Sequence, residues 1–290
     1  MRSVRVALAA LPLALACRRP AELAPAPGAM PATARDASPA AYDAAVADGD
    51  RAWPVRGDPA RLDAAIAAYG RAAALRPGDA AAELRLARAE AFRGIASASA
   101  AKEPWDASAR AAERALRRIA PAWAEAIDRG EDPAGAAARV DAPGAEALYL
   151  LAQGAMRSSQ ATGYAAVLAV KDAALAMMSR AAELDERLDA AGPHRALGAW
   201  RAALPTAAGG GAAASRAHFE RARALAPDDL LGRVAEAETY AVLVQDAARF
   251  EALLGEVLKA DPAREPQRAP ENAVAQRRAK ELLERKARLF

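Results

Sequence analysis

The stretch Ser215–Asp229, with the sequence SRAHFERARALAPDD, decides the fold of this chain. Ser215, Phe219 and Ala222 follow one another at helical intervals of four and then three residues, so they share one face of a helix. Ala222 is small enough to let a neighbouring helix come close, the ring of Phe219 fills the space beyond it, and Pro227 ends the helix. The stretch therefore predicts stacked helical hairpins.

The same helix face recurs in the first half of the chain. It is repeated, with its terminating proline, by Ala65, Tyr69, Ala72 and Pro77, and without the proline by Ala174, Met178 and Ala181. Near Pro121 and Pro262 the pattern is poor, so the repeat is degenerate. A face of this kind is typical of the second helix of a tetratricopeptide-type pair. We expect an all-α solenoid of about five antiparallel helix pairs plus a C-terminal capping helix.

Proline and glycine mark where the helices should begin and end. The expected helices cover residues 40–52, 59–75, 79–101, 105–119, 145–159, 164–188, 193–204, 215–226, 230–244, 250–258 and 271–288. Between residues 123 and 143 the pattern is weak, because Asp132-Pro133 and Gly135 interrupt a polar stretch. The turn at 160–163 is short, so the two long helices on either side of it should lie antiparallel.

Composition supports a helical protein without a nucleic-acid partner. The chain has 290 residues, of which 53% are hydrophobic but only 4% aromatic, so alanine supplies most of the apolar fraction. Alanine favours helices, whereas strands favour branched and aromatic side chains. The net charge of +3 is small and acidic residues are interspersed with the arginines, so there is no basic stripe for nucleic acid.

The N-terminal residues are a predicted targeting segment. Arg2 and Arg5 precede an apolar run over residues 6–16, which is too short to span a bilayer and is typical of a signal peptide. The sequence LALAC, ending at Cys17, resembles a bacterial lipoprotein cleavage and lipidation box. An ordinary secretory peptide with an incidental cysteine is the alternative. Since Cys17 is the only cysteine, the chain has no intrachain disulfide.

We expect three segments: a signal peptide at 1–16, a lipidated Cys17 with a disordered tether at 17–40, and a single helical domain at 41–290. The tether is rich in proline and alanine and cannot form a core. The lipid would anchor the protein in the cell envelope, facing the periplasm. The sequence leaves open whether the domain forms a homo-oligomer.

The chain offers little for catalysis. The glycines at 209–211 lack the lysine and Ser/Thr that a phosphate loop requires, so they are interpreted as a linker. His194 and His218 have no second histidine or cysteine at ligand spacing, so no metal site is predicted. Glu236 is expected on the solvent side of its helix, where charges are normally hydrated. No cofactor, metal or enzymatic activity is expected.

Binding is better supported than reaction, because stacked helix pairs offer a concave surface. The residues that could line a groove for an apolar ligand or a partner segment are the aromatic side chains Tyr164, Trp200, Phe219, Tyr240 and Phe250. The alternative is that they fill the core of a protein with few aromatic residues.

Four stretches in the C-terminal half carry a family resemblance. They are LGAWRAALPTAAGGG (197–211), HFERARAL (218–225), AEAETYAVLVQDAARFEALLGEVL (235–258) and ENAVAQRRAKELL (271–283). In this order they resemble the T component associated with TRAP transporters, over residues 145–290. The resemblance implies a periplasmic lipoprotein of tetratricopeptide-like fold. It also implies an accessory protein that docks a TRAP-type periplasmic substrate-binding protein and helps pass an organic solute. A general envelope scaffold is the alternative function.

Overall fold

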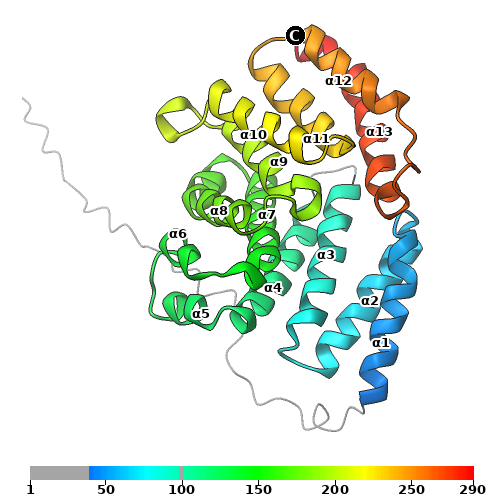
Figure 1. Ribbon diagram of the computed structural model, residues 1–290, viewed down its shortest axis with the longest axis vertical. Coiled ribbons are helices and arrows are strands. Elements are labelled where there is room, and N and C mark those ends of the chain that lie inside the picture. Colours follow the sequence, from blue (N-terminus) through cyan, green and yellow to red (C-terminus); the bar gives the residue numbers. More distant parts are fainter. Residues whose placement is uncertain (1–38, 98–100) are drawn as a thin grey trace, which may run out of the picture. The chain divides into compact units, whose positions relative to one another are not determined.

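The computed structural model describes residues 39–97 and 101–290, and regular structure within these ranges is entirely helical (Figure 1). The described residues belong to one compact unit of the chain. The expected all-α fold is confirmed. The predicted signal peptide, the lipidation site Cys17 and nearly all of the predicted tether lie outside the described residues.

The helices form five successive pairs and a final single helix, as expected. The pairs are α1 (Pro39–Ala52) with α2 (Pro59–Leu75), α3 (Ala80–Ala96) with α4 (Lys102–Ile119), α7 (Ala145–Thr162) with α8 (Tyr164–Leu184), α9 (Leu188–Ala203) with α10 (Ala212–Leu225), and α11 (Leu230–Ala235), continued by a π-helical segment (Glu236–Ala241), with α12 (Ala247–Lys259). The last helix is α13 (Ala269–Glu284), followed by a 3₁₀ turn (Lys286–Arg288).

The weakly patterned stretch between residues 123 and 143 lies outside these pairs. It forms α5 (Pro121–Asp128) and α6 (Pro133–Ala136), with two 3₁₀ turns (Ala137–Arg139 and Ala142–Gly144). Further 3₁₀ turns lie at Trp53–Val55, Thr206–Ala208 and Pro266–Arg268.

Aspartates fix the start of several helices. The carboxylate of Asp58 accepts the backbone N–H of Ala60 at 2.8 Å, and Pro59 follows it in the first turn of α2. Asp79 caps α3 and Asp229 caps α11 in the same way. These caps fix the start of the second helix of the first pair and of the first helices of two later pairs.

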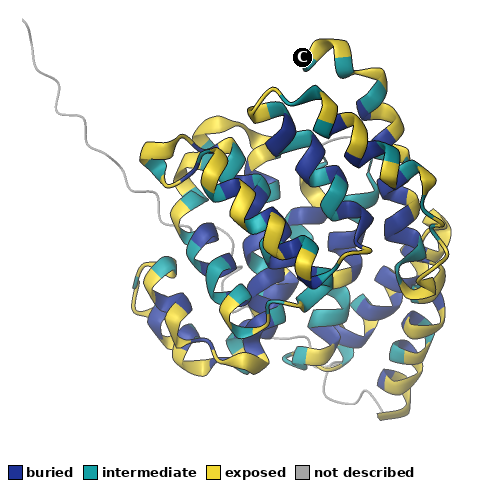
Figure 2. Ribbon diagram, turned by 45° about the horizontal axis from the view of Figure 1, so that its top comes forward, coloured by how far each residue is buried: buried dark blue, intermediate teal, exposed yellow. Residues whose placement is uncertain are grey.

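Close helix contacts depend on small residues facing large ones. Phe219 of α10 is 1% exposed, and a Cβ atom added to Gly198 of α9 would lie 2.9 Å from its ring. The hydroxyl of Ser215 donates to the carbonyl of Gly198 at 2.8 Å. Ala222, one turn further on, is also buried. The helix face that the sequence singled out therefore forms the α9–α10 contact, and the buried faces of the other helices likewise point inward (Figure 2).

Helix α13 returns to the first hairpin, so the two ends of the row of helix pairs meet. Val274 of α13 packs in one buried cluster with Leu62 of α2 and Phe92 of α3. Close to them, Arg56 pairs with Glu271 at 2.6 Å, and both side chains are nearly buried. Figure 1 shows α13 beside the turn that joins α1 to α2. The expected capping helix therefore closes the row against its own beginning.

Two local features test the sequence-based expectation, and one agrees with it while the other does not. The backbone of Asp189, Ala190 and Ala191 lies in the left-handed region, so the regular part of α9 begins near Pro193, as predicted. The prediction that Glu236 faces solvent is wrong, since its side chain is buried. Its carboxylate pairs with Arg223 of α10 at 3.2 Å and with Arg249 of α12 at 2.9 Å, so the buried charge is compensated.

The Gly198–Phe219 contact can be tested by replacing Gly198 with alanine, which adds one methyl group at the interface. We expect Gly198→Ala to destabilise the fold by about 1–3 kcal/mol, because the added Cβ would meet the Phe219 ring inside a packed interface. Gly255→Ala in α12 is the matched control, since nothing lies within 4 Å of its added Cβ. Urea unfolding measures both, and equal midpoints for the two variants would contradict the packing described.

Candidate functional site

The five aromatic side chains predicted to line a groove do not lie together. Trp200 belongs to the central core cluster and Phe250 to the C-terminal one. Phe219 packs on Gly198, and Tyr240 is also buried. Only Tyr164 is open to solvent, with 70% of its surface exposed. As placed in the structure, four of the five residues are core residues.

An inner cavity lies where α3, α4, α7, α9, α11 and α13 converge. Trp200 lines it together with Trp105, Val234 and Arg278. Its volume is about 60 Å³, which accommodates a few water molecules. Pockets for organic ligands usually measure about 300–1,000 Å³. In this structure the inner cavity is therefore too small to hold an organic solute.

A buried charge network lies beside the inner cavity. Arg195 of α9 contacts the carboxylates of Asp189 and Asp229 at 2.7 Å each, and Arg268 reaches the same two carboxylates at 3.0 Å. The hydroxyl of Tyr149 donates to Asp189 at 2.7 Å. Burial acts to raise the pKa of Asp189, but Arg195 and Arg268 outweigh it and hold that pKa below its ordinary value. The network ties α7, α9 and α11 to the segment that leads into α13.

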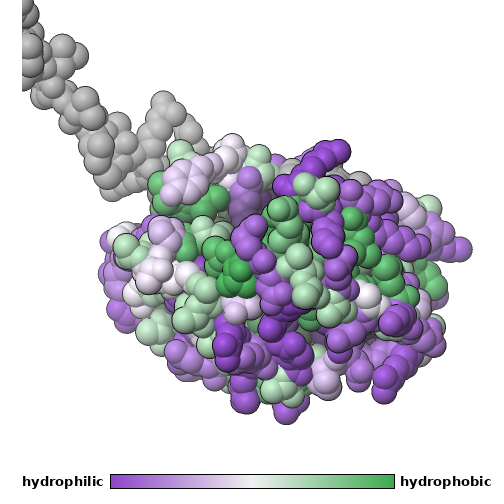
Figure 3. Space-filling view, turned by 90° about the horizontal axis from the view of Figure 1, so that it is seen from above, coloured by the Kyte–Doolittle hydropathy of each residue, from purple (hydrophilic) through white to green (hydrophobic). Residues whose placement is uncertain are grey.

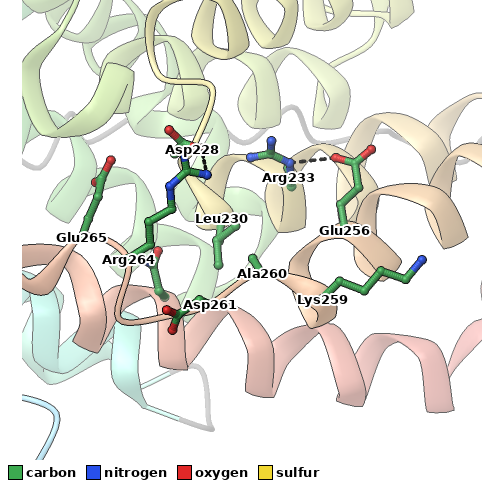
Figure 4. Close-up of a pocket in the computed structure, with 10 residues that line it drawn as sticks. Asp228, Leu230, Arg233, Glu256, Lys259, Ala260, Asp261, Arg264 and Glu265 are labelled. Carbon is green, nitrogen blue, oxygen red and sulfur yellow. Dashed lines mark hydrogen bonds and ion pairs between the residues drawn. The ribbon is translucent and has the colours of Figure 1, made fainter.

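A larger cleft lies between α11, α12 and the segment that joins α12 to α13 (Figure 4). Its volume is about 430 Å³. Its lining is formed by Asp228, Leu230, Arg233, Glu256, Lys259, Ala260, Asp261, Arg264, Glu265 and Asn272. Arg233 pairs with Glu256 at 2.9 Å and Arg264 with Asp228 at 3.3 Å. A cleft with so many charges of both signs suits a polar partner surface better than an apolar solute.

The first two turns of α8 present an apolar face to solvent. Tyr164 is 70% and Leu168 is 43% exposed, and Ala165 and Ala169 are exposed beside them. These four residues, here called the α8 patch, share one side of the helix because they are one and four residues apart. Further along α8, Ala174 is buried in the core, so only the start of the helix projects.

Exposed large apolar side chains also lie outside the patch, at Val55, Leu243, Val244 and Phe290, but none of these is as exposed as Tyr164. On the face seen in Figure 3, hydrophobic and charged residues lie side by side. Apolar side chains that gather on one exposed helix face commonly mark a site of protein association. Among the described features, the α8 patch is therefore the candidate docking surface.

The two histidines, which the sequence treated as isolated, lie together. The Nδ1 atom of His194 on α9 is 3.1 Å from the Nδ1 atom of His218 on α10. Burial and the neighbouring His194 lower the pKa of His218 to about 4, and burial also lowers the pKa of His194. Both rings are therefore neutral at pH 7. Within residues 39–97 and 101–290, no group of three or more His, Cys, Asp or Glu side chains is arranged to hold a metal ion.

Comparison with known families assigns the chain. The model of the family described as TRAP transporter T-component matches residues 93–290. The chain belongs to the TRAP transporter T-component family. The resemblance found in the sequence is thereby confirmed, and it extends upstream of residue 145. No curated protein matches the chain.

The family places this T-component among the accessory parts of TRAP transport. The matched residues include the α8 patch, the charged cleft, the charge network and the histidine pair, and they leave out the first hairpin. None of the helices in the described ranges has the length and apolar character needed to cross a membrane.

The histidine pair predicts an acid-dependent loss of stability. The pKa of His218 is about 4 in the folded protein and about 6.5 in the unfolded chain, so between these values only the unfolded chain binds the proton. We expect the free energy of unfolding to fall as the pH is lowered from about 6.5 to about 4. In His218→Gln the free energy of unfolding should fall less over this pH range. Urea titrations at each pH measure it, with EDTA present to remove metal ions. A wild-type and a variant curve of the same slope would contradict the lowered pKa that burial gives His218.

Proposed function

We propose that this T-component is a lipid-anchored periplasmic accessory protein that docks a TRAP-type substrate-binding protein in the uptake of organic solutes. The family match over residues 93–290 is the observation that carries the proposal. Docking suits this fold because its inner cavity is too small for an organic solute, its larger cleft is lined mostly by charged residues, and apolar side chains are exposed at the start of α8. The solute itself then stays with the binding protein.

The α8 patch is the docking surface in this proposal. Tyr164 offers a large, amphipathic side chain of the type enriched in protein interfaces. Leu168 and the two exposed alanines extend it along one face, and the Lys171–Asp172 ion pair supplies a charged rim. An apolar centre with a polar rim is the usual composition of a specific interface.

The lipid anchor is the second part of the proposal. Cys17 follows the predicted signal peptide directly, and the segment from 17 to 40 would act as a tether. If extended at about 3.1 Å per residue, this tether reaches on the order of 70 Å from the membrane surface. That reach would let the helical domain meet a partner that diffuses in the periplasm.

Charge on the α8 patch tests the docking surface. We expect Tyr164→Asp with Leu168→Asp to abolish recovery of the substrate-binding protein in a pull-down from envelope extract, because burying the new carboxylates would oppose association. Leu243→Asp is the matched control, since Leu243 and Leu168 are each 43% exposed. Circular dichroism verifies that both variants are folded.

The outcomes separate the parts of the proposal. Recovery of the binding protein by the doubly substituted chain would move docking to another surface. Failure of the wild-type chain to recover any substrate-binding protein would overturn docking itself. A change of mass in light scattering for the doubly substituted chain would assign the α8 patch to a homo-oligomer.

Removal of the thiol tests the anchor. We expect Cys17→Ala to move the protein from the membrane to the soluble envelope fraction, because the lipid can no longer be attached. Fractionation of cells followed by immunoblotting gives the result. A variant that stays with the membrane would show that Cys17 is not the anchor.

A general envelope scaffold, in which the helix pairs hold an assembly unrelated to transport, is the alternative. Gene neighbourhood separates the two functions. Adjacent genes for a TRAP permease and a binding protein favour the docking proposal, and their absence favours the scaffold.

A further inference from the structure

The histidine pair of α9 and α10 has the geometry of a two-ligand metal site. His194 and His218 are 24 residues apart in the chain, and their Nδ1 atoms are 3.1 Å apart. The ring N–H of one is aimed at the lone pair of the other, so both nitrogens face the same narrow space. The rings are tilted by 36° with their centroids 5.4 Å apart, so they are not stacked.

The distance between the two nitrogens fits an ion between them. Imidazole nitrogens bind Zn²⁺ at about 2.0–2.1 Å. Two nitrogens at that distance from one ion and 3.1 Å from each other subtend an angle of about 98° at the ion. This value lies between the angles of square-planar and tetrahedral coordination. An ion could therefore replace the shared hydrogen with small rotations of the two rings.

A carboxylate stands beside the other nitrogen of His194. Glu186 Oε2 is 4.0 Å from His194 Nε2, and Arg221 holds Glu186 through contacts of 2.6 and 3.0 Å. Histidines that bind metals commonly direct their second ring nitrogen to a carboxylate, which orients the ring. Glu186 is thus placed to act as a positioning residue for His194.

The surroundings leave room for further ligands. Both histidines are partly exposed, and 15% of the His194 side chain is open to solvent. The two nearby guanidinium groups are bound to other partners: Arg221 pairs with Glu186, and Arg201 donates to the carbonyl of Gly209 at 2.6 Å. Water can complete the coordination of an ion held by the two rings.

We propose that His194 and His218 form a binding site for one divalent transition-metal ion of the zinc, copper and nickel class, with Glu186 as the positioning residue. Imidazole ligands select these ions over magnesium and calcium, which prefer oxygen. The bound ion links α9 to α10 and so stabilises this hairpin. The site does not depend on the docking proposal.

Calorimetric titration tests the site. The full chain is prepared without a histidine tag and with Cys17→Ala, which removes the one thiol that would bind the same ions, and is stripped with EDTA. We expect one Zn²⁺ or Cu²⁺ per chain, a raised melting temperature with the ion, and an affinity at least tenfold lower in His194→Gln and in His218→Gln. Glu186→Gln should weaken binding by about tenfold. Glu220→Gln, an exposed carboxylate on α10, should leave it unchanged.

Electron paramagnetic resonance of bound Cu²⁺ gives a readout that altered stability would not mimic. We expect hyperfine coupling to two imidazole nitrogens in the parent chain and to one in His218→Gln. Retention of the full affinity in a chain with both histidines replaced would assign the ion to surface carboxylates and overturn the proposal. A parent chain that binds neither ion would overturn it as well.

Discussion

The buried ion pair between Arg56 and Glu271 is the contact on which the arrangement of the helices depends. The guanidinium of Arg56 donates to both oxygens of Glu271, at 3.0 and 2.6 Å, and to the carbonyl of Gln267 at 2.6 Å. It also lies 4.3 Å from the ring centre of Trp53 and 5.2 Å from that of Phe92. Loss of one partner from such a buried pair typically costs about 3–5 kcal/mol, because the other charge is left uncompensated. The first hairpin and the last helix are therefore joined by a specific contact and not only by apolar packing.

Closure of the row explains where recognition can occur. Since α13 contacts the first hairpin and the charge network around Asp189 and Arg195 ties the segment before α13 to the middle of the chain, the inner cavity measures only about 60 Å³. A tetratricopeptide-type row that stays open offers its concave side to a partner. In this T-component the most exposed large apolar side chain among the described residues is Tyr164, on the outer face of α8.

Much of the fold follows from local sequence signals. The caps at Asp58 and Asp79 and the face formed by Ser215, Phe219 and Ala222 depend on residues close in the chain, and they predict the helices and hairpins correctly. The family could be predicted as well, because four stretches typical of it follow one another in the same order in this sequence.

The contacts that the sequence could not predict join residues far apart in the chain, or depend on how neighbouring helices face each other. The Arg56–Glu271 contact joins residues 215 positions apart. The histidine pair requires that two turns of successive helices lie opposite each other, which spacing alone does not reveal. Glu236 is buried beside Arg249 at 2.9 Å and Arg223 at 3.2 Å, and these two partners come from the neighbouring helices α12 and α10. The buried aromatic residues were open to two interpretations, since an apolar helix face looks the same in a core and in a groove.

Disulfide trapping tests the closure of the helix row most directly. A Cβ atom added to Gly57 would lie 3.7 Å from the Cβ of Pro270, a separation that suits a disulfide bond. In a chain that carries Cys17→Ser, Gly57→Cys and Pro270→Cys should form an intramolecular disulfide under mild oxidation and keep the native circular dichroism spectrum. Cysteines that stay reduced, or that link only separate chains, would contradict the contact between α13 and the first hairpin.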